Sequence, residues 1–237
     1  MAYAQISNRN FGGQSTFMEA FLEAVEIATG SQPQLAVIWL HGLGADGHDF
    51  EPIVPELPLP FAVRYVFPHA PVRPVTVNGG VAMRAWYDIL GWGPNVRQDS
   101  AGVRASAAAV TRLIDREIVR GVPAERIVLA GFSQGGAIAL HTALREPRRL
   151  AGVLALSTYL PLADTLAAER SSVSTGLPIF MAHGTEDSIL PLAMAESSRR
   201  ELEAAGYAVE WRVYPMAHSV CGPEIAAIGA WLTTRVT

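Results

Sequence analysis

The sequence contains no lysine, and all 18 of its lysine-or-arginine positions are arginine. Without a lysine, no amine is present to form a Schiff base with a carbonyl substrate or with pyridoxal phosphate, and a Walker A phosphate loop is excluded. A single cysteine, Cys221, rules out an internal disulfide, as is usual in a reducing compartment. We therefore expect a cytoplasmic protein and interpret Cys221 as a small structural residue.

Long apolar runs, closely spaced metal ligands and positive charge are also scarce. No apolar stretch approaches the roughly 18 residues that cross a bilayer, and no cluster has the spacing of zinc ligands. Acidic residues interrupt the one candidate secretion signal at Glu19, Glu23 and Glu26. The net charge of −4 argues against nucleic acid as a partner. We expect no membrane span, no metal and no cofactor.

The remaining pattern is an alternation of apolar strands and amphipathic helices. We expect strands near 35–40, 62–67, 126–130, 152–156, 178–183 and 208–214, and helices that include 98–120 and 223–232. Buried-type strands alternating with helices predict an α/β fold, with a doubly wound, mostly parallel sheet and helices on both faces. The chain length suits one domain, residues 21–237, preceded by an N-terminal extension, residues 1–20.

Residues 131–135 read Gly-Phe-Ser-Gln-Gly, the G-x-S-x-G pattern of a nucleophile elbow. In such an elbow a strand turns sharply into a helix, and the serine lies at the tip of the turn. An apolar strand precedes Ser133 and an apolar helical stretch follows it. A serine that merely opens a helix in a Gly-rich loop is the alternative, but the context favours a catalytic nucleophile.

A nucleophilic serine needs a base and an orienting acid, which follow it in the order acid, then histidine. His141 falls within the helix after the serine, and His183 ends a strand that acids follow directly, so His218 is the predicted base. Asp187 and Glu186 are the acids that directly follow that strand. Of these two, Asp187 is favoured because its side chain is shorter. The other acidic residues between Ser133 and His218 are assigned to a charged helix, a strand, or loop-like stretches such as that of Asp164 and Glu169.

The Gly-rich loop 41–47 follows the strand 35–40 and is the predicted oxyanion loop, with the N–H of Gln134 as the second donor. The same loop also matches G-x-G-x-x-G, a dinucleotide fingerprint. That alternative requires a helix at the loop and an acid at the end of the next strand. Pro52 and Pro55 interrupt the expected helix, and the next strand ends in Pro68 and His69, so dinucleotide binding is disfavoured.

Taken together, these motifs make the chain resemble the bacterial carboxylesterase and acyl-protein thioesterase (lysophospholipase-like) family of the α/β-hydrolases. The resemblance covers about residues 22–237 and rests on residues 39–47, 68–71, 78–80, 86–89, 131–136, 156–159, 183–187 and 214–218. Ala217-His218-Ser219 departs from the Gly-His-Glu usual in bacterial members and is nearer to the eukaryotic thioesterases. The resemblance also favours a first strand near 22–28 over a short helix capped by Thr16 and Glu19.

The resemblance implies Ser133 as nucleophile, Asp187 as acid and His218 as base, with the N–H groups of Leu43 and Gln134 as oxyanion donors. It implies a serine hydrolase of carboxylic esters, with thioesters or lysophospholipids as further substrates, and is compatible with a homodimer. Acyl-protein thioesterase activity, a peptidase and a binding protein of the same fold without catalysis are the alternatives. The Pro/Gly-rich stretch 68–98 is interpreted as a lid or binding loop rather than a satellite core, with Trp86 contacting substrate.

Overall fold

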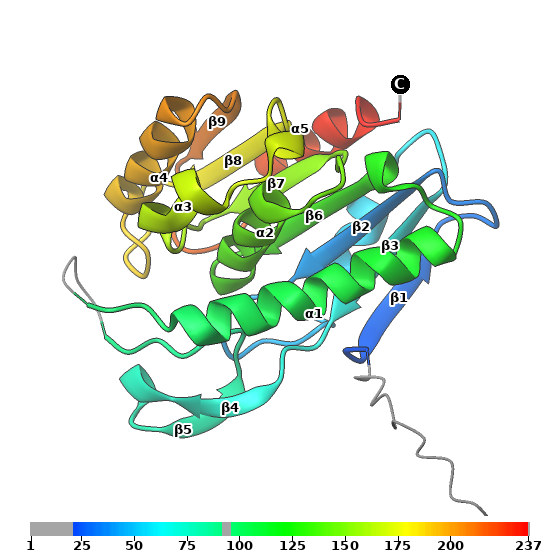
Figure 1. Ribbon diagram of the computed structural model, residues 1–237. Coiled ribbons are helices and arrows are strands. Elements are labelled where there is room, and N and C mark those ends of the chain that lie inside the picture. Colours follow the sequence, from blue (N-terminus) through cyan, green and yellow to red (C-terminus); the bar gives the residue numbers. More distant parts are fainter. Residues whose placement is uncertain (1–20, 92–95, 237) are drawn as a thin grey trace, which may run out of the picture.

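A computed structural model gives the structure of the protein, and it describes residues 21–91 and 96–236 (Figure 1). The predicted extension, residues 1–20, lies outside the described residues. The central sheet has seven strands in the order β1-β3-β2-β6-β7-β8-β9. These strands are β1 (Ala24–Ala28), β2 (Leu35–Leu40), β3 (Val63–Pro68), β6 (Ile127–Phe132), β7 (Gly152–Leu156), β8 (Ile179–Gly184) and β9 (Val209–Tyr214).

Every neighbouring pair in this sheet is parallel except β1 and β3, which are antiparallel. The predicted α/β-hydrolase architecture with a mostly parallel sheet is therefore confirmed. The order departs from the sequence between β3 and β6, where the chain crosses from one side of β2 to the other. In an open parallel sheet, such a reversal places ligand sites at the carboxyl ends of the adjacent strands.

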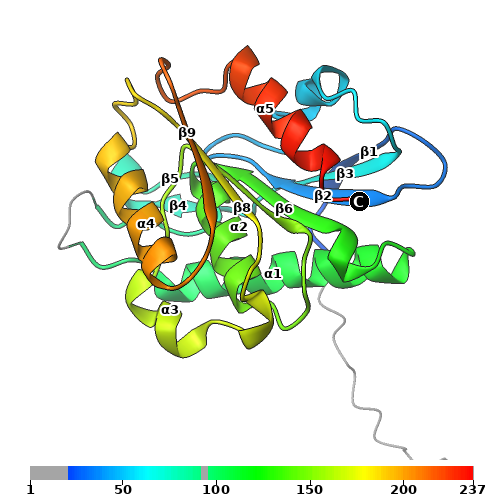
Figure 2. The same ribbon diagram turned by 90° about the horizontal axis from the view of Figure 1, so that it is seen from above.

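Helices cover both faces of the sheet (Figure 2). One face carries the four helices α1 (Ser100–Val119), α2 (Gln134–Arg145), α3 (Ala163–Glu169) and α4 (Leu192–Ala204), and the other carries α5 (Gly222–Thr233) and the short 3-10 helix η1 (Glu51–Glu56). Two further 3-10 turns, η3 (Ala124–Arg126) and η4 (Ser172–Ser174), lie in connections. Among residues 21–91 and 96–236, no helix combines the length and apolar character that a bilayer crossing requires.

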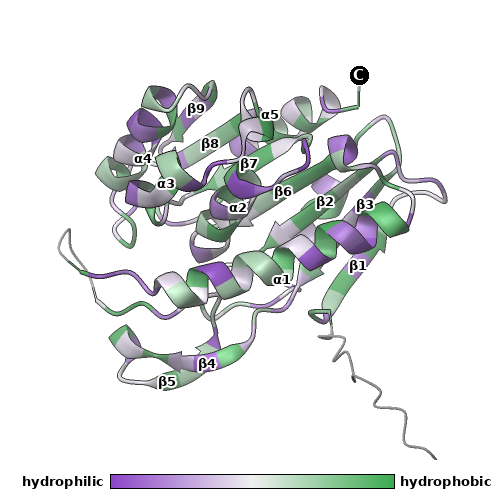
Figure 3. Cartoon of the chain, viewed as in Figure 1, coloured by the Kyte–Doolittle hydropathy of each residue, from purple (hydrophilic) through white to green (hydrophobic). Residues whose placement is uncertain are grey.

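Burial on both faces explains why the inner strands are apolar along their whole length. All six residues of β2 are buried, and alternate residues contribute to the two cores: Ala36, Ile38 and Leu40 to one, and Leu35, Val37 and Trp39 to the other. Figure 3 shows the same contrast, with apolar inner strands and polar stretches on the outer helices. A continuous apolar run is what a two-sided sheet requires.

Residues 68–98, predicted as one long connection, contain secondary structure of their own. A two-stranded antiparallel sheet of β4 (Val72–Val75) and β5 (Val81–Arg84), joined by η2 (Thr76–Asn78), projects from the body of the protein (Figure 1). Trp86 and Tyr87 then return to the main core, where both are buried. The sequence, interpreted as a lid or binding loop, did not predict these two strands, because both are short and β4 contains Pro74.

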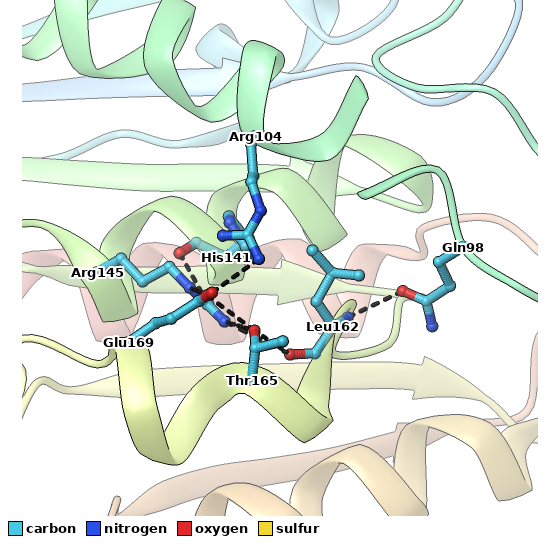
Figure 4. Close-up of polar contacts among 7 residues, drawn as sticks. All are labelled: Gln98, Arg104, His141, Arg145, Leu162, Thr165 and Glu169. Carbon is cyan, nitrogen blue, oxygen red and sulfur yellow. Dashed lines mark hydrogen bonds and ion pairs between the residues drawn. The ribbon is translucent and has the colours of Figure 1, made fainter. Parts of the chain in front are cut away.

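Asp164 and Glu169, predicted to lie in a loop-like stretch, lie in α3 instead. Tertiary contacts hold this short helix, because Glu169 accepts hydrogen bonds from Arg104 of α1 and Arg145 of α2 at 2.7 Å each (Figure 4). Arg145 also donates to Thr165 of α3. A helix of seven residues is too short to be stable alone, so sequence periodicity could not predict it.

Candidate active site

Ser133 occupies the turn between β6 and α2 with φ 53° and ψ −122°, outside the regions that non-glycine residues usually adopt. Two hydrogen bonds with the end of β7 and the residues that follow it hold this backbone. The N–H of Ser133 donates to the carbonyl of Leu156 at 2.9 Å, and the buried Thr158 hydroxyl donates to the Ser133 carbonyl at 2.6 Å. The end of β7 therefore stabilises the strained turn, as expected for a nucleophile elbow.

Glycine is required on both sides of Ser133 because other backbone approaches closely there. A Cβ at Gly131 would lie 2.4 Å from the carbonyl carbon of Gly135. A Cβ at Gly135 would lie 2.3 Å from the carbonyl oxygen of Leu40. The two glycines thus allow the tight turn itself and the close packing of α2 against the end of β2.

Asp187 lies in the loop after β8 and contacts His218 in the loop between β9 and α5. His218 Nδ1 lies 2.7 Å from Asp187 Oδ2, while Asp187 Oδ1 accepts the backbone N–H groups of Ile189 and Leu190 at 3.0 and 2.8 Å. Both oxygens of the buried carboxylate are therefore held in place. Glu186, the neighbouring candidate, is exposed to solvent.

His183 lies beneath this pair and is fully buried. Its Nε2 lies 2.8 Å from the carbonyl oxygen of Leu190 and 3.3 Å from Asp187 Oδ2. Burial lowers the pKa of His183, so the ring is neutral near pH 7 and Nε2–H is the donor. His183 thus supports the loop that carries Asp187.

The ring of His218 packs on Phe132, the residue before Ser133, with ring centroids 4.7 Å apart. With Nδ1 directed at Asp187, Nε2 is the ring nitrogen that remains for other contacts. The elbow follows β6, Asp187 follows β8 and His218 follows β9, so all three residues lie at the carboxyl edge of the sheet. Parallel strands bring residues from distant parts of the sequence together at this edge.

The loop after β2 lies against the elbow. A Cβ at Gly42 would lie 3.6 Å from the Cβ of Ser133, and Gly44 N–H donates to the carbonyl of Arg84 at 2.9 Å. His41 fixes the start of the loop, because its Nε2 accepts the Ala70 N–H at 3.0 Å. Burial lowers the pKa of His41 to about 4, so the ring is neutral near pH 7.

Gln134 has buried side-chain contacts that sequence reasoning missed. Its Oε1 accepts the N–H of Trp86 at 2.8 Å, and its Nε2 donates to the carbonyl of Tyr87 at 2.7 Å. The indole N–H of Trp86 in turn donates to the carbonyl of His41 at 2.9 Å. Through Trp86, Gln134 is connected to the loop that carries Leu43. No local sequence pattern predicts such contacts, because the partners are more than 40 residues apart.

Trp86, predicted to contact substrate, is fully buried, and its backbone N–H and indole N–H donate to Gln134 and His41. Its carbonyl also accepts the hydroxyl of Ser106 in α1. Trp86 lies behind the 41–47 loop, so the geometry supports an indirect role for Trp86, in which it holds this loop in position. Among the described residues, no group of three histidine, cysteine or acidic side chains could hold a metal ion.

The sequence profile of the phospholipase/carboxylesterase family matches residues 22–236. The chain belongs to this family. Curated relatives include acyl-protein thioesterase 1 of Neurospora crassa, which is 40% identical over 84% of this chain and 86% of its own length. Acyl-protein thioesterase 1 of Cryptococcus neoformans is 35% identical over 91% of this chain and 98% of its own.

Solved structures agree with this membership. The crystal structure of SOBER1 from Arabidopsis thaliana has a TM-score of 0.81 and 31% identity, covering 86% of this chain and 99% of that chain. Acyl-protein thioesterase 2 from Zea mays has a TM-score of 0.81 and 27% identity, over 92% and 100% of the two chains. As a member of the phospholipase/carboxylesterase family, the protein is a serine hydrolase of carboxylic esters or thioesters.

Proposed function

We propose that the protein hydrolyses esters and thioesters through an acyl-enzyme on Ser133. His218 Nε2 takes the proton of Ser133 as its Oγ attacks the acyl carbonyl, and then gives that proton to the leaving alcohol or thiol. Asp187 holds the ring by Nδ1 and stabilises the imidazolium that forms. A water activated by His218 then releases the acid. The observation that carries this proposal is the 2.7 Å contact between His218 and Asp187, at the edge of the sheet where Ser133 forms the elbow.

The backbone N–H groups of Leu43 and Gln134 are the proposed oxyanion donors. Gln134 is the first residue of α2, and N–H groups in the first turn of a helix have no acceptor within the helix. The 41–47 loop contacts Ser133 at Gly42, and this contact supports Leu43, the next residue, as a donor. Each such donor contributes roughly 3–4 kcal/mol to transition-state stabilisation. In this mechanism Trp86 positions the loop from behind.

Oxygen esters and thioesters are both proposed substrates. The acyl-enzyme chemistry is the same for the two, because only the leaving atom differs. The names of the fungal relatives favour S-acylated protein as a substrate, and the family description favours carboxylic esters. An acyl-chain series of matched oxygen and thio esters, measured as kcat/KM, distinguishes a main thioesterase from a main carboxylesterase.

The decisive test is Ser133→Ala together with a fluorophosphonate probe. We expect the variant to keep its fold and lose at least about 10³-fold in kcat, because triad residues act as a unit. The probe should label the wild type at Ser133 alone and leave the variant unlabelled. Ser188→Ala, at an exposed position beside Asp187, is the matched control and should be labelled normally. Substantial turnover by folded Ser133→Ala would refute the mechanism.

We also propose, from the sequence, that the protein acts in the cytoplasm and forms a homodimer. The single cysteine supports the first proposal and the family resemblance the second. Cell fractionation tests the compartment. Sedimentation equilibrium at several concentrations tests the dimer, and a monomer at all concentrations would exclude it.

A further inference from the structure

A cavity of about 410 Å³ opens beside His218, between η1 and the connection from β9 to α5. These two segments meet because α5 packs beside η1 on one face of the sheet (Figure 2). The walls are mainly apolar and include Phe50, Ile53, Val220 and Ile225. The roles proposed above for the triad and the oxyanion loop assign no function to this cavity.

The position of the cavity relates it to one step of the reaction. His218 and Phe132 both line it, and their rings are in contact. In acylation the bond from Ser133 Oγ to the acyl carbon forms, the bond from that carbon to the leaving sulfur or oxygen breaks, and His218 Nε2 delivers the proton to the leaving atom. The leaving group must therefore lie beside His218, which is where the cavity opens.

The charge at the rim of the cavity is negative. Asp49 and Glu56 line it and are exposed, and no arginine lines it within the described part of the chain. The apolar walls with an acidic rim suit a group that is apolar near the reacting atom and positively charged further out. A polyanionic group would be repelled.

We propose that this cavity is the leaving-group subsite, and that it selects alcohols and thiols with an apolar, cationic leaving portion over anionic ones. The inference rests on the proposed function, because it assigns the subsite to the acylation step of the same triad. Quaternary ammonium thiols and alcohols, and cysteines flanked by arginine or lysine, have this chemistry. Nucleotide-bearing thiols such as coenzyme A have the opposite charge.

The test uses three butanoyl thioesters that share the acyl group and a two-carbon spacer. Their leaving groups are thiocholine, which is cationic, its neutral carbon isostere 3,3-dimethylbutanethiol, and the anionic 2-mercaptoethanesulfonate. Since kcat/KM reports acylation and the acyl group is constant, differences among the three arise from the leaving group. At low ionic strength we expect thiocholine to exceed the sulfonate by about ten-fold or more, with a smaller ratio in high salt.

The variant Asp49→Asn/Glu56→Gln should reduce the thiocholine-to-sulfonate ratio by about ten-fold. The matched control, Glu125→Gln/Glu203→Gln, removes two charges from exposed positions that do not line the cavity and should keep the ratio. A ratio that is unchanged in the rim variant, with all three esters still cleaved, would overturn the subsite while leaving the proposed function intact. Failure to cleave even the neutral ester would count against the proposed function itself.

A size test is independent of charge. Ile225→Trp fills part of the cavity and should lower kcat/KM for the dimethylbutanethiol ester relative to the methanethiol ester, which barely enters it. Labelling of Ser133 by a small fluorophosphonate confirms that the variant is folded and active. If both esters responded equally to Ile225→Trp, the cavity would not be the leaving-group subsite.

Discussion

Gln134 Oε1 accepts the backbone N–H of Trp86 at 2.8 Å, in a fully packed region between the elbow helix and the segment after β5. Since the Trp86 indole also donates to the carbonyl of His41, this one side chain connects both proposed oxyanion donors. Gln134 would therefore act through its N–H and, in addition, through its side chain. That second role follows from contacts that sequence reasoning did not anticipate.

We expect Gln134→Ala to lower kcat by about ten-fold or more with little change in KM. Truncation leaves the buried Trp86 N–H unpaired, which costs about 1–3 kcal/mol, and the 41–47 loop loses its alignment. Gln98→Ala is the matched control, because Gln98 likewise accepts one backbone N–H, that of Leu162, outside the oxyanion loop (Figure 4). Steady-state kinetics on folded protein measure both, and an unchanged kcat in Gln134→Ala would remove the positioning role.

Asp187→Asn should lower kcat by several orders of magnitude, whereas Glu186→Gln should leave kcat nearly unchanged. Asn keeps the shape but presents the wrong partner to His218 Nδ1, and the comparable change in a serine protease costs about 10⁴-fold. Glu186 is exposed and serves as the adjacent control. Turnover near neutral pH, with circular dichroism to check folding, makes the comparison. An inactive Glu186→Gln beside an active Asp187→Asn would reverse the acid assignment.

Gly135→Ala should eliminate most activity, because the new methyl group would lie 2.3 Å from the Leu40 carbonyl oxygen. Relief of that clash moves the first turn of α2 away from the oxyanion loop, and small displacements of this kind reduce rates about 10²-fold. Gly229→Ala is a helical control, since its nearest contact is 3.5 Å away at Leu57. Fluorophosphonate labelling rates and thermal melting of both variants test the idea. Full activity in Gly135→Ala would contradict the packing described for the elbow.

Glu224 predicts a pH dependence of stability. This carboxyl group is fully buried in the first turn of α5, and burial raises its pKa from 4.5 to about 7. Between pH 4.5 and 7 the folded protein holds a proton that the unfolded chain has lost, so the free energy of unfolding falls as pH rises through this window and levels off above it. Across this window the titration of Glu224 lowers the free energy of unfolding by roughly 3 kcal/mol.

Glu224→Gln removes this titration. We expect the variant to be more stable than the wild type at pH 8 and to differ less at pH 5, because the wild-type carboxyl is neutral in the folded protein at the lower pH. Urea unfolding at pH 5, 6, 7 and 8 measures the difference. Parallel stability curves for the two proteins would show that Glu224 does not titrate in this window.

The sequence alone determined the elements whose signals are local or periodic. Continuous apolar runs predicted the inner strands to within one or two residues at most ends, and the spacing of apolar residues predicted α1. The elbow motif selected Ser133, and chain order selected Asp187 and His218, which the structure places in contact. The strand and helix predictions succeeded because burial on both faces of a sheet requires continuous apolar runs, and the glycines on both sides of Ser133 mark the tight turn.

Only the tertiary structure decided the features that depend on contacts between distant residues. Trp86 was predicted to contact substrate because it is an aromatic residue in a Pro/Gly-rich segment. Packing against α1 and the 41–47 loop buries it instead. The helix α3 exists through the ion pairs of Glu169 with two other helices, and Gln134 meets residues 47 and 48 positions earlier. Such contacts form only once the sheet has brought the segments together, so no window of sequence contains them.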